Sequence, residues 1–309
     1  MAVIGVGFWG QNHARVFSEL EETELVAVCD MNRQKVKEAS RRFGVKGYVR
    51  VGQLLRRKDL DAVSVCVWPS RLGEIALKVL QAGKHAFVEK PMATNTYLAQ
   101  RLLNEAKKRE LYLSTGFLLR FLPCIQKMKE LIHSGDLGEL VCLIAKRFSW
   151  RPQRIGALGV VRDLAIHDFD MARFLLETEP ARVYARIKKV VHKNLNDYAQ
   201  VALLFKGGID FFIEACWLTP PKVRTLTVIG DQKIAHLDYI KQEVSIKHEQ
   251  EEIKLDIPKV EPLTLELKHF ARCILKGEKP IITGEDGLHA LKIAEAALKS
   301  SKTGKLVKL

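Results

Sequence analysis

Lys90, Asp163 and His167 are the side chains whose types and spacing best suit proton transfer to or from an alcohol. Asp163 and His167 are four residues apart, so a helix would place them on one face, with Asp170 one further turn along. A carboxylate one turn away can orient an imidazole as a general base. A lone Asp and His pair on a helix is more often structural, so its interpretation depends on what else the chain supplies.

Lys90 lies in the tripeptide of Glu89, Lys90 and Pro91, which directly follows the apolar run 85–88. We predict that this run is the fourth strand of a nucleotide-binding sheet. Ligands of open parallel sheets bind at the carboxyl ends of the strands, so a lysine there, stiffened by a proline, would face whatever reacts with the nucleotide.

The chain opens with a strand, a glycine-rich turn and an amphipathic segment, in that order. Val3 and Ile4 begin the strand, and the turn reads GVGFWG. The first glycine allows the tight turn, the second lets the backbone approach a pyrophosphate, and the third lets helix and strand pack closely. We therefore predict a dinucleotide cofactor held by Gly5, Gly7, Phe8, Trp9 and Gly10.

Asp30 follows a second predicted strand, 25–29, and lies 20 residues after Gly10. A carboxylate at this position accepts hydrogen bonds from a ribose 2′-hydroxyl and repels a 2′-phosphate, so we predict NAD rather than NADP. Arg33 lies close enough to soften that repulsion and is a further candidate cofactor contact. The alternative is that Asp30 is an ordinary strand-end or helix-capping aspartate.

Strands and helices continue to alternate, with strands predicted at 61–67 and 111–115 and helices at 72–81 and 97–109. This order predicts an α/β, doubly wound Rossmann domain over residues 1–117. Trp68 and Pro69 follow the third strand, where the indole could stack on the cofactor or the pair could simply form a turn. Together with Glu89 and Lys90 they complete the candidate cofactor contacts.

From residue 118 the pattern changes to long alternating segments, at 141–150, 183–190, 199–205 and 209–217. Such segments are typical of an open, mostly antiparallel sheet covered on one face, so we predict an α+β substrate-binding and oligomerisation domain over 118–309. Amphipathic helices are expected at 265–275 and 287–300, and the C-terminal helix is free to pack back on the first domain.

Composition excludes several classes of protein. With 309 residues, 47% of them hydrophobic, the chain is long enough for two cores, and no apolar run has membrane-spanning length. The formal charge of +14 is spread among acidic residues without a basic stripe, so we expect no nucleic-acid partner. The six cysteines form no CxxC pair, which predicts reduced residues and no metal site. The first strand leaves no room for a signal peptide, so we expect a cytoplasmic protein.

The glycine motif, the tripeptide at Lys90 and the Asp163 and His167 pair resemble, in this order, the motifs of the Gfo/Idh/MocA family of sugar and polyol dehydrogenases. The resemblance implies that Lys90 binds or polarises the reacting oxygen, that His167 takes the hydroxyl proton and that Asp163 orients them. Hydride would pass from the carbinol carbon to the nicotinamide. It also implies a homodimer or homotetramer formed through the open sheet, and suggests a cis peptide bond before Pro91.

Segments 154–168 and 217–224 further resemble the branch of this family that oxidises the 3-hydroxyl of UDP-N-acetylglucosamine. A nucleotide-sugar diphosphate needs cationic donors, although each such charge could instead lie on a surface or an interface. The candidate substrate-binding residues are Arg120, Arg151, Arg154, Asp170, Trp217, Lys222 and Arg224.

The sequence therefore predicts an NAD-dependent dehydrogenase acting on a sugar or nucleotide sugar. A first alternative is a myo-inositol or free-sugar dehydrogenase of the same family, which would not need the diphosphate-binding cations. A second is a non-catalytic NAD-binding regulator, which the presence of Lys90, Asp163 and His167 disfavours because a regulator needs no positioned proton acceptor.

Overall fold

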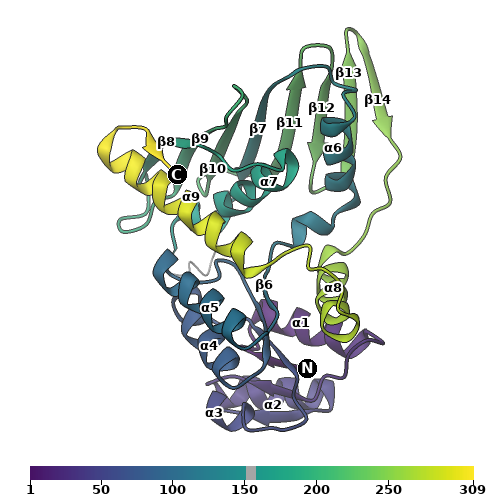
Figure 1. Cartoon of the computed structure of the whole chain (residues 1–309), viewed down its shortest axis with the longest axis vertical. Coiled ribbons are helices and arrows are strands. Elements are labelled where there is room, and N and C mark those ends of the chain that lie inside the picture. The colour runs from purple at the N-terminus through teal and green to yellow at the C-terminus, as the bar shows by residue number, and fades with distance from the viewer. Residues whose placement is uncertain (151–157) are drawn as a thin grey trace. The chain divides into compact units, whose positions relative to one another are not determined.

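The computed structural model describes residues 1–150 and 158–309. The chain folds into two compact units, shown in Figure 1. The first consists of Met1–Leu118 and Pro262–Leu288, and the second of Leu119–Glu261 and His289–Leu309. The first unit is an α/β Rossmann fold and the second is α+β with an open sheet, which confirms the predicted fold class.

The first unit contains a parallel six-stranded sheet in the order β3-β2-β1-β4-β5-β6. Strand order reverses between β1 and β4, which is where open α/β sheets bind ligands. The strands are Ala2–Ile4 (β1), Ala27–Cys29 (β2), Lys46–Tyr48 (β3), Ala62–Val65 (β4), His85–Val88 (β5) and Leu113–Thr115 (β6).

The strand before Lys90 is therefore the fifth along the chain, and its prediction as the fourth was wrong. The sequence analysis missed β3, whose three residues Lys46, Gly47 and Tyr48 are exposed or half-buried. A short edge strand of this composition has no apolar run that would reveal it.

Helices flank the first sheet, and several begin where the sequence supplies a cap. Asn32 accepts the N–H groups of Gln34 and Lys35 at the start of α2, and Asn95 accepts that of Leu98 in α5. The helices of this unit are Phe8–Glu19 (α1), Arg33–Phe43 (α2), Val51–Leu54 (α3), Pro69–Gln81 (α4), Thr96–Lys108 (α5) and Pro262–Lys276 (α8), followed by the start of Gly284–Thr303 (α9).

Helix α8 returns from late in the sequence to complete the core of the first unit. Leu263, Leu267 and Phe270 pack in one buried cluster with residues of β1, α1, β2 and β5. The rings of Phe270 and Phe87 meet edge to face with centroids 5.5 Å apart. Two stretches of the chain separated by more than a hundred residues therefore share one hydrophobic core.

The second unit is built on a nine-stranded sheet in the order β14-β13-β12-β11-β7-β10-β9-β8-β15. Among the strands of the described residues, only β7 and β10 pair in parallel; the other neighbours are antiparallel. The strands are Leu140–Phe148 (β7), Arg182–Lys188 (β8), Tyr198–Leu204 (β9), Asp210–Cys216 (β10), Val223–Gly230 (β11), Ile234–Asp238 (β12), Glu243–His248 (β13), Glu251–Leu255 (β14) and Val307–Lys308 (β15).

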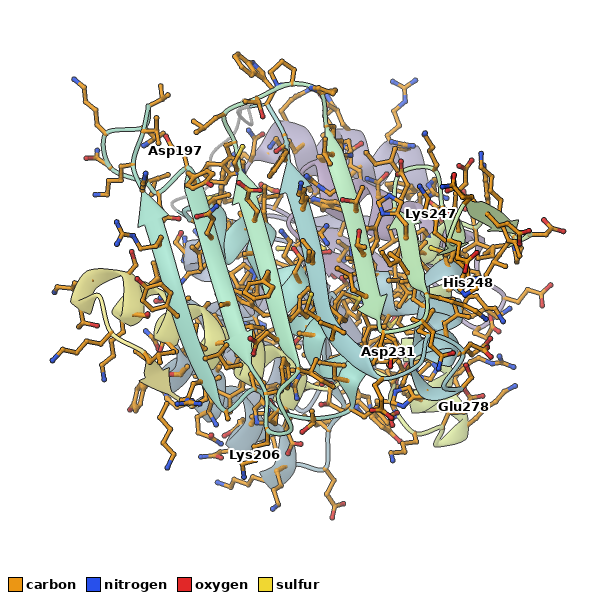
Figure 2. All side chains as sticks on the ribbon, turned by 90° about the horizontal axis from the view of Figure 1, so that it is seen from above. Asp197, Lys206, Asp231, Lys247, His248 and Glu278 are labelled. Carbon is orange, nitrogen blue, oxygen red and sulfur yellow. The ribbon has the colours of Figure 1, made fainter. Side chains whose placement is uncertain are left out.

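Helices cover one face of this second sheet. Helix α6 (Pro123–His133) packs on β12 and β13, and the turn Val161–Ala165 before α7 (Ile166–Leu176) packs on β10. Figure 2 looks onto the other face, where the strands lie in front of the helices. Phe212 on β10 is exposed there, whereas its neighbours Phe211 and Ile213 are buried on the helix side. None of the described helices is both long and apolar enough to span a membrane.

Candidate active site

The glycine turn has the geometry of a phosphate-binding loop. Gly5 has a φ of +88°, and a Cβ on Gly10 would lie 1.6 Å from the carbonyl oxygen of Gly5, so only glycine fits at Gly10. Helix α1 follows directly, with no side chain capping its N-terminus and no acidic residue in its first turn. An uncapped, positively polarised helix end beside a glycine turn favours a negatively charged ligand, so these residues fit the pyrophosphate of NAD.

Asp30 fastens the end of β2 to this turn. Its Oδ2 accepts the N–H of Val6 at 3.0 Å, and its Oδ1 accepts the N–H of Asn32 at 2.9 Å. Each carboxylate oxygen can accept more than one hydrogen bond, so Asp30 retains acceptor capacity for a ribose hydroxyl. Arg33 is exposed at the first position of α2.

Three aromatic side chains are exposed around the loops that follow β1 and β4. Phe8 is 72% exposed, Trp9 44% and Trp68 56%, and the rings of Phe8 and Trp9 meet edge to face with centroids 5.7 Å apart. Pro69 occupies the first turn of α4, where a missing N–H costs nothing. Large apolar side chains left in water at the ligand-binding edge of a sheet are suited to stack on a planar ring.

In the tripeptide after β5, the side chains of Lys90 and Glu89 have different surroundings. Lys90 is half-buried, and its peptide bond to Pro91 is cis. Glu89 is buried: its Oε1 lies 3.0 Å from Nε2 of His13, and its Oε2 accepts the N–H of Lys90 at 3.2 Å. The carboxylate is thus engaged inside the protein, and the contact of Glu89 with the cofactor stays a prediction. Sequence reasoning missed His13, whose signal was its place three residues after Gly10.

Asp163 and His167 lie at a change of helix type. Residues Val161–Ala165 form one turn of π-helix, and α7 begins at Ile166, so the predicted single α-helix through Asp163 and His167 is corrected. Both side chains are half-buried. Hydrogen bonds in a π turn span one residue more than in an α-helix, and such turns often occur at functional sites.

The start of the π turn is held by a neighbouring loop. Asn196 accepts the N–H of Val160 through its backbone carbonyl at 2.8 Å, and its Oδ1 lies 3.3 Å from the N–H of Val161. Asp197, next along, accepts three backbone N–H groups from Val190, Val191 and His192. This loop therefore fixes the backbone that carries Asp163.

Two aspartates that follow His167 on α7 form buried ion pairs. Asp168 accepts two hydrogen bonds from Arg147 of β7, at 2.7 and 2.6 Å, and Asp170 accepts two from Arg120, at 3.0 and 2.6 Å. Arg120 and Asp170 were predicted to bind substrate, but both are buried and paired with each other. Asp170 is therefore buried, whereas Asp163 and His167 are only half-buried. Arg147 and Asp168 were missed.

The remaining predicted substrate residues differ in exposure. Trp217 is buried, and Lys222 is exposed. Arg224 is half-buried and donates from Nη1 to the carbonyl oxygens of Phe148 and Val223, at 2.6 and 2.9 Å. Burial, and then the charge of Arg147, lower the pKa of Arg224 to about 10, although nearby carboxylates oppose the shift. Arg151 and Arg154 lie outside the described residues.

The cysteines and acidic groups offer no evident metal centre. All six cysteines are free, and four of them are buried. Within residues 1–150 and 158–309, no three His, Cys, Asp or Glu side chains gather closely enough to hold a metal ion.

The chain belongs to the Gfo/Idh/MocA family of oxidoreductases. Residues 1–117 match the family model described as an oxidoreductase family with an NAD-binding Rossmann fold, and residues 125–236 match the GFO/IDH/MocA C-terminal domain. The predicted family is confirmed.

Individual relatives span the whole chain. The myo-inositol 2-dehydrogenase of Thermotoga maritima is 30% identical, over 100% of this chain and 98% of its own. The UDP-N-acetylglucosamine 3-dehydrogenase of Acidithiobacillus ferrooxidans is 26% identical, over 96% and 94%. A solved structure of the latter enzyme superposes with a TM-score of 0.88, covering 98% of both chains. Both relatives are named as dehydrogenases.

Proposed function

We propose that the protein is an NAD-dependent dehydrogenase that oxidises a secondary hydroxyl of a sugar, with the 3-hydroxyl of UDP-N-acetylglucosamine, or of a related nucleotide sugar, as the favoured substrate. The observation that carries the choice of an anionic substrate is Arg224. Its guanidinium is half-buried and donates from Nη1 to the carbonyl oxygens of Phe148 and Val223, which carry no charge to neutralise it. An incompletely neutralised, partly desolvated cation favours an anionic ligand such as a diphosphate.

The chemistry is divided among three side chains. Lys90 binds and polarises the hydroxyl oxygen of the substrate, and His167 accepts the hydroxyl proton as the general base. Asp163 orients these groups. NAD, when bound, accepts the hydride from the carbinol carbon. Lys90 and His167 are both half-buried, which leaves each side chain partly accessible to a ligand.

The cofactor is held by the glycine turn, by Asp30 and by the exposed aromatic side chains of Trp68 and Trp9. We favour NAD over NADP because the Asp30 carboxylate would repel a 2′-phosphate. Arg33 is the nearest cation in sequence that could weaken this discrimination. In this arrangement the backbone of the turn binds the pyrophosphate and the side chain of Asp30 selects the ribose.

A free-polyol dehydrogenase is the second candidate, favoured by the relative from Thermotoga maritima that is named a myo-inositol 2-dehydrogenase. The deciding experiment incubates the protein with NAD or NADP and a panel of UDP-sugars, myo-inositol and free hexoses, and follows NADH absorbance. We expect turnover with UDP-N-acetylglucosamine. Turnover confined to polyols would overturn the choice of substrate, and NAD binding without turnover on any sugar would support a regulator instead.

Arg224→Gln tests the diphosphate argument directly. We expect KM for a UDP-sugar to rise about tenfold or more, because a charge-assisted contact to phosphate is lost, with little change for a free sugar. Arg101→Gln is the matched control, since Arg101 is exposed on α5. An equal effect of the Arg224 change on both substrates would remove the argument.

We further propose that the protein is a cytoplasmic homodimer or homotetramer. The exposed face of the nine-stranded sheet, with Phe212 in its middle strands, is the surface that we expect a second copy to cover. Light scattering coupled to size exclusion gives the mass, and a monomer at micromolar concentration would contradict this proposal.

A further inference from the structure

His13 is a fully buried histidine on the helix that begins at the glycine turn. Its ring packs edge to face on Phe87, with centroids 5.5 Å apart. Both ring nitrogens have a polar partner: Nδ1 lies 2.8 Å from Oγ of Ser64 on β4, and Nε2 lies 3.0 Å from Oε1 of Glu89. One side chain of α1 thus joins two adjacent strands of the sheet at their carboxyl ends.

The Glu89 carboxylate is held from three directions. His13 contacts Oε1, and the N–H of Lys90 donates to Oε2. Gly116 closes a third side, because a Cβ there would lie 3.3 Å from the carboxylate atoms. Gly116 also donates its N–H to the carbonyl of Val88, at 2.9 Å, so the backbone around Lys90 is tied on both sides. Glu89 therefore has little freedom to move without moving the backbone of Lys90.

The hydrogen bonds of the His13 ring are those expected of a positively charged imidazole beside the Glu89 carboxylate. Burial by itself lowers the pKa of His13, but Cys66 and Glu89 raise it, to about 10. A charged imidazole donates from both nitrogens, which matches an acceptor hydroxyl on Ser64 and an acceptor carboxylate on Glu89. The Sγ of Cys66 lies 3.4 Å from Oγ of Ser64 and extends the network by one group.

We propose that His13 is a positioning residue: through Glu89 it fixes the backbone of Lys90 and so couples the phosphate-binding helix to the lysine of the reaction. This inference rests on the proposed function of Lys90. The coupling path has two hydrogen bonds, from His13 to Glu89 and from the Lys90 backbone to Glu89. Helix α1 directly follows the glycine turn, where the cofactor's pyrophosphate would bind, so the pair places the backbone of Lys90 relative to that turn.

Three variants separate positioning from general stability. His13→Phe keeps an aromatic ring of similar volume but removes both hydrogen bonds, and His13→Gln retains a donor for Glu89. His85→Phe is the matched control: His85 lies at the other end of the same strand, β5, and its Nδ1 accepts the backbone N–H of Tyr112 at 3.0 Å. For each variant we would measure kcat, KM, the Kd of NAD by tryptophan fluorescence, and Tm.

We expect His13→Phe to lower kcat between about tenfold and about a hundredfold, because a small displacement of a catalytic group is enough for such a loss. The Kd of NAD should stay within about twofold, since the turn itself is unchanged. His13→Gln should recover most of kcat, and His85→Phe should lower Tm without lowering kcat. A kcat for His13→Phe close to wild type, or equal losses in the Phe and Gln variants, would overturn the inference.

A measurement without turnover keeps this test separate from the proposed function. After reductive ¹³C-methylation of lysines, the NMR signal of Lys90 is the one missing in Lys90→Arg. We expect His13→Phe to shift this signal and His85→Phe to leave it in place; an unmoved signal would overturn the inference. Lys90→Ala could keep full turnover while His13→Phe still shifts the signal of Lys90. The catalytic role of Lys90 would then be lost, but the link from His13 to Lys90 would stand.

Discussion

The two units hold their proposed reactive groups in different ways. In the first, Asp30 directly follows β2 and Lys90 lies two residues after β5, so the carboxyl ends of parallel strands bring both residues to the same edge of the sheet. In the second, His167 lies on a helix fastened to the rest of its unit by the pairs of Arg147 with Asp168 and Arg120 with Asp170, whose members are 21 and 50 residues apart. A strand end is placed mainly by local sequence, with the contact of His13 and Glu89 added to it, whereas a helix held by buried ion pairs depends on distant partners throughout.

The proposed reactive groups themselves should give the largest effects. Lys90→Ala and His167→Ala should each lower kcat by about 10²–10⁴-fold, because proton transfer and oxygen binding are lost, with the Kd of NAD close to unchanged. Steady-state kinetics together with fluorescence titration of NAD provide the measurement. Near-normal turnover in either variant would remove that residue from the proposed mechanism, in whichever unit it lies.

Breaking an ion pair in the second unit should cost stability. Arg147→Met leaves Asp168 charged and buried without its partner, so the free energy of unfolding should fall by about 3–5 kcal/mol in urea titrations. The control is the double variant Arg147→Met with Asp168→Leu, which removes both charges and should recover much of the loss. If the single and double variants were equally unstable, the pair would not be what fastens α7.

His13 and Glu89 form a buried pair in the first unit, and the pH dependence of stability should reveal the charge of His13. The pKa of His13 is raised from 6.5 to about 10, so its contribution to stability is fully present below pH 6.5 and is lost as pH rises toward 10. By linkage a shift of this size corresponds to about 5 kcal/mol, so between these pH values wild type should lose stability relative to His13→Gln, which cannot titrate there. Parallel stability curves for the two proteins would show that His13 is uncharged in the folded state.

Asp30→Ala should have the smallest effect of the four. Loss of the carboxylate should weaken NAD binding and reduce the preference for NAD over NADP by about tenfold. This is the effect expected from losing one hydrogen bond to a charged group. Asp30→Asn keeps an acceptor for the N–H of Val6 or Asn32, and so separates turn geometry from charge. If both variants kept the wild-type preference for NAD over NADP, Asp30 would have no role in selecting the cofactor and would only hold the turn through its hydrogen bonds.

The same contrast explains what the sequence could predict. The strand, turn and helix at the glycine motif and the strand before Glu89 follow from short local patterns, and the structure contains them. Long-range partners have no such pattern. Arg120 and Asp170 are charged residues of the kind that bind substrates, so the sequence favoured that role. They are 50 residues apart, and only the tertiary fold brings them together as an ion pair. Strands β11 to β14 also escaped prediction, because several of their alternate residues are only half-buried and give a weak pattern.

The return of residues 262–288 to the first unit determines when that unit can be completed during protein synthesis. Leu263, Leu267 and Phe270 fill the core beside Phe17 and Phe87, yet they leave the ribosome only after nearly the whole second unit has been made. We therefore expect the core of the first unit to stay incomplete, with apolar side chains exposed, until these residues are made. The first unit would then not finish folding before the second is synthesised, although N-terminal domains generally fold first. A nascent chain stalled before residue 262 should expose that surface to chaperones.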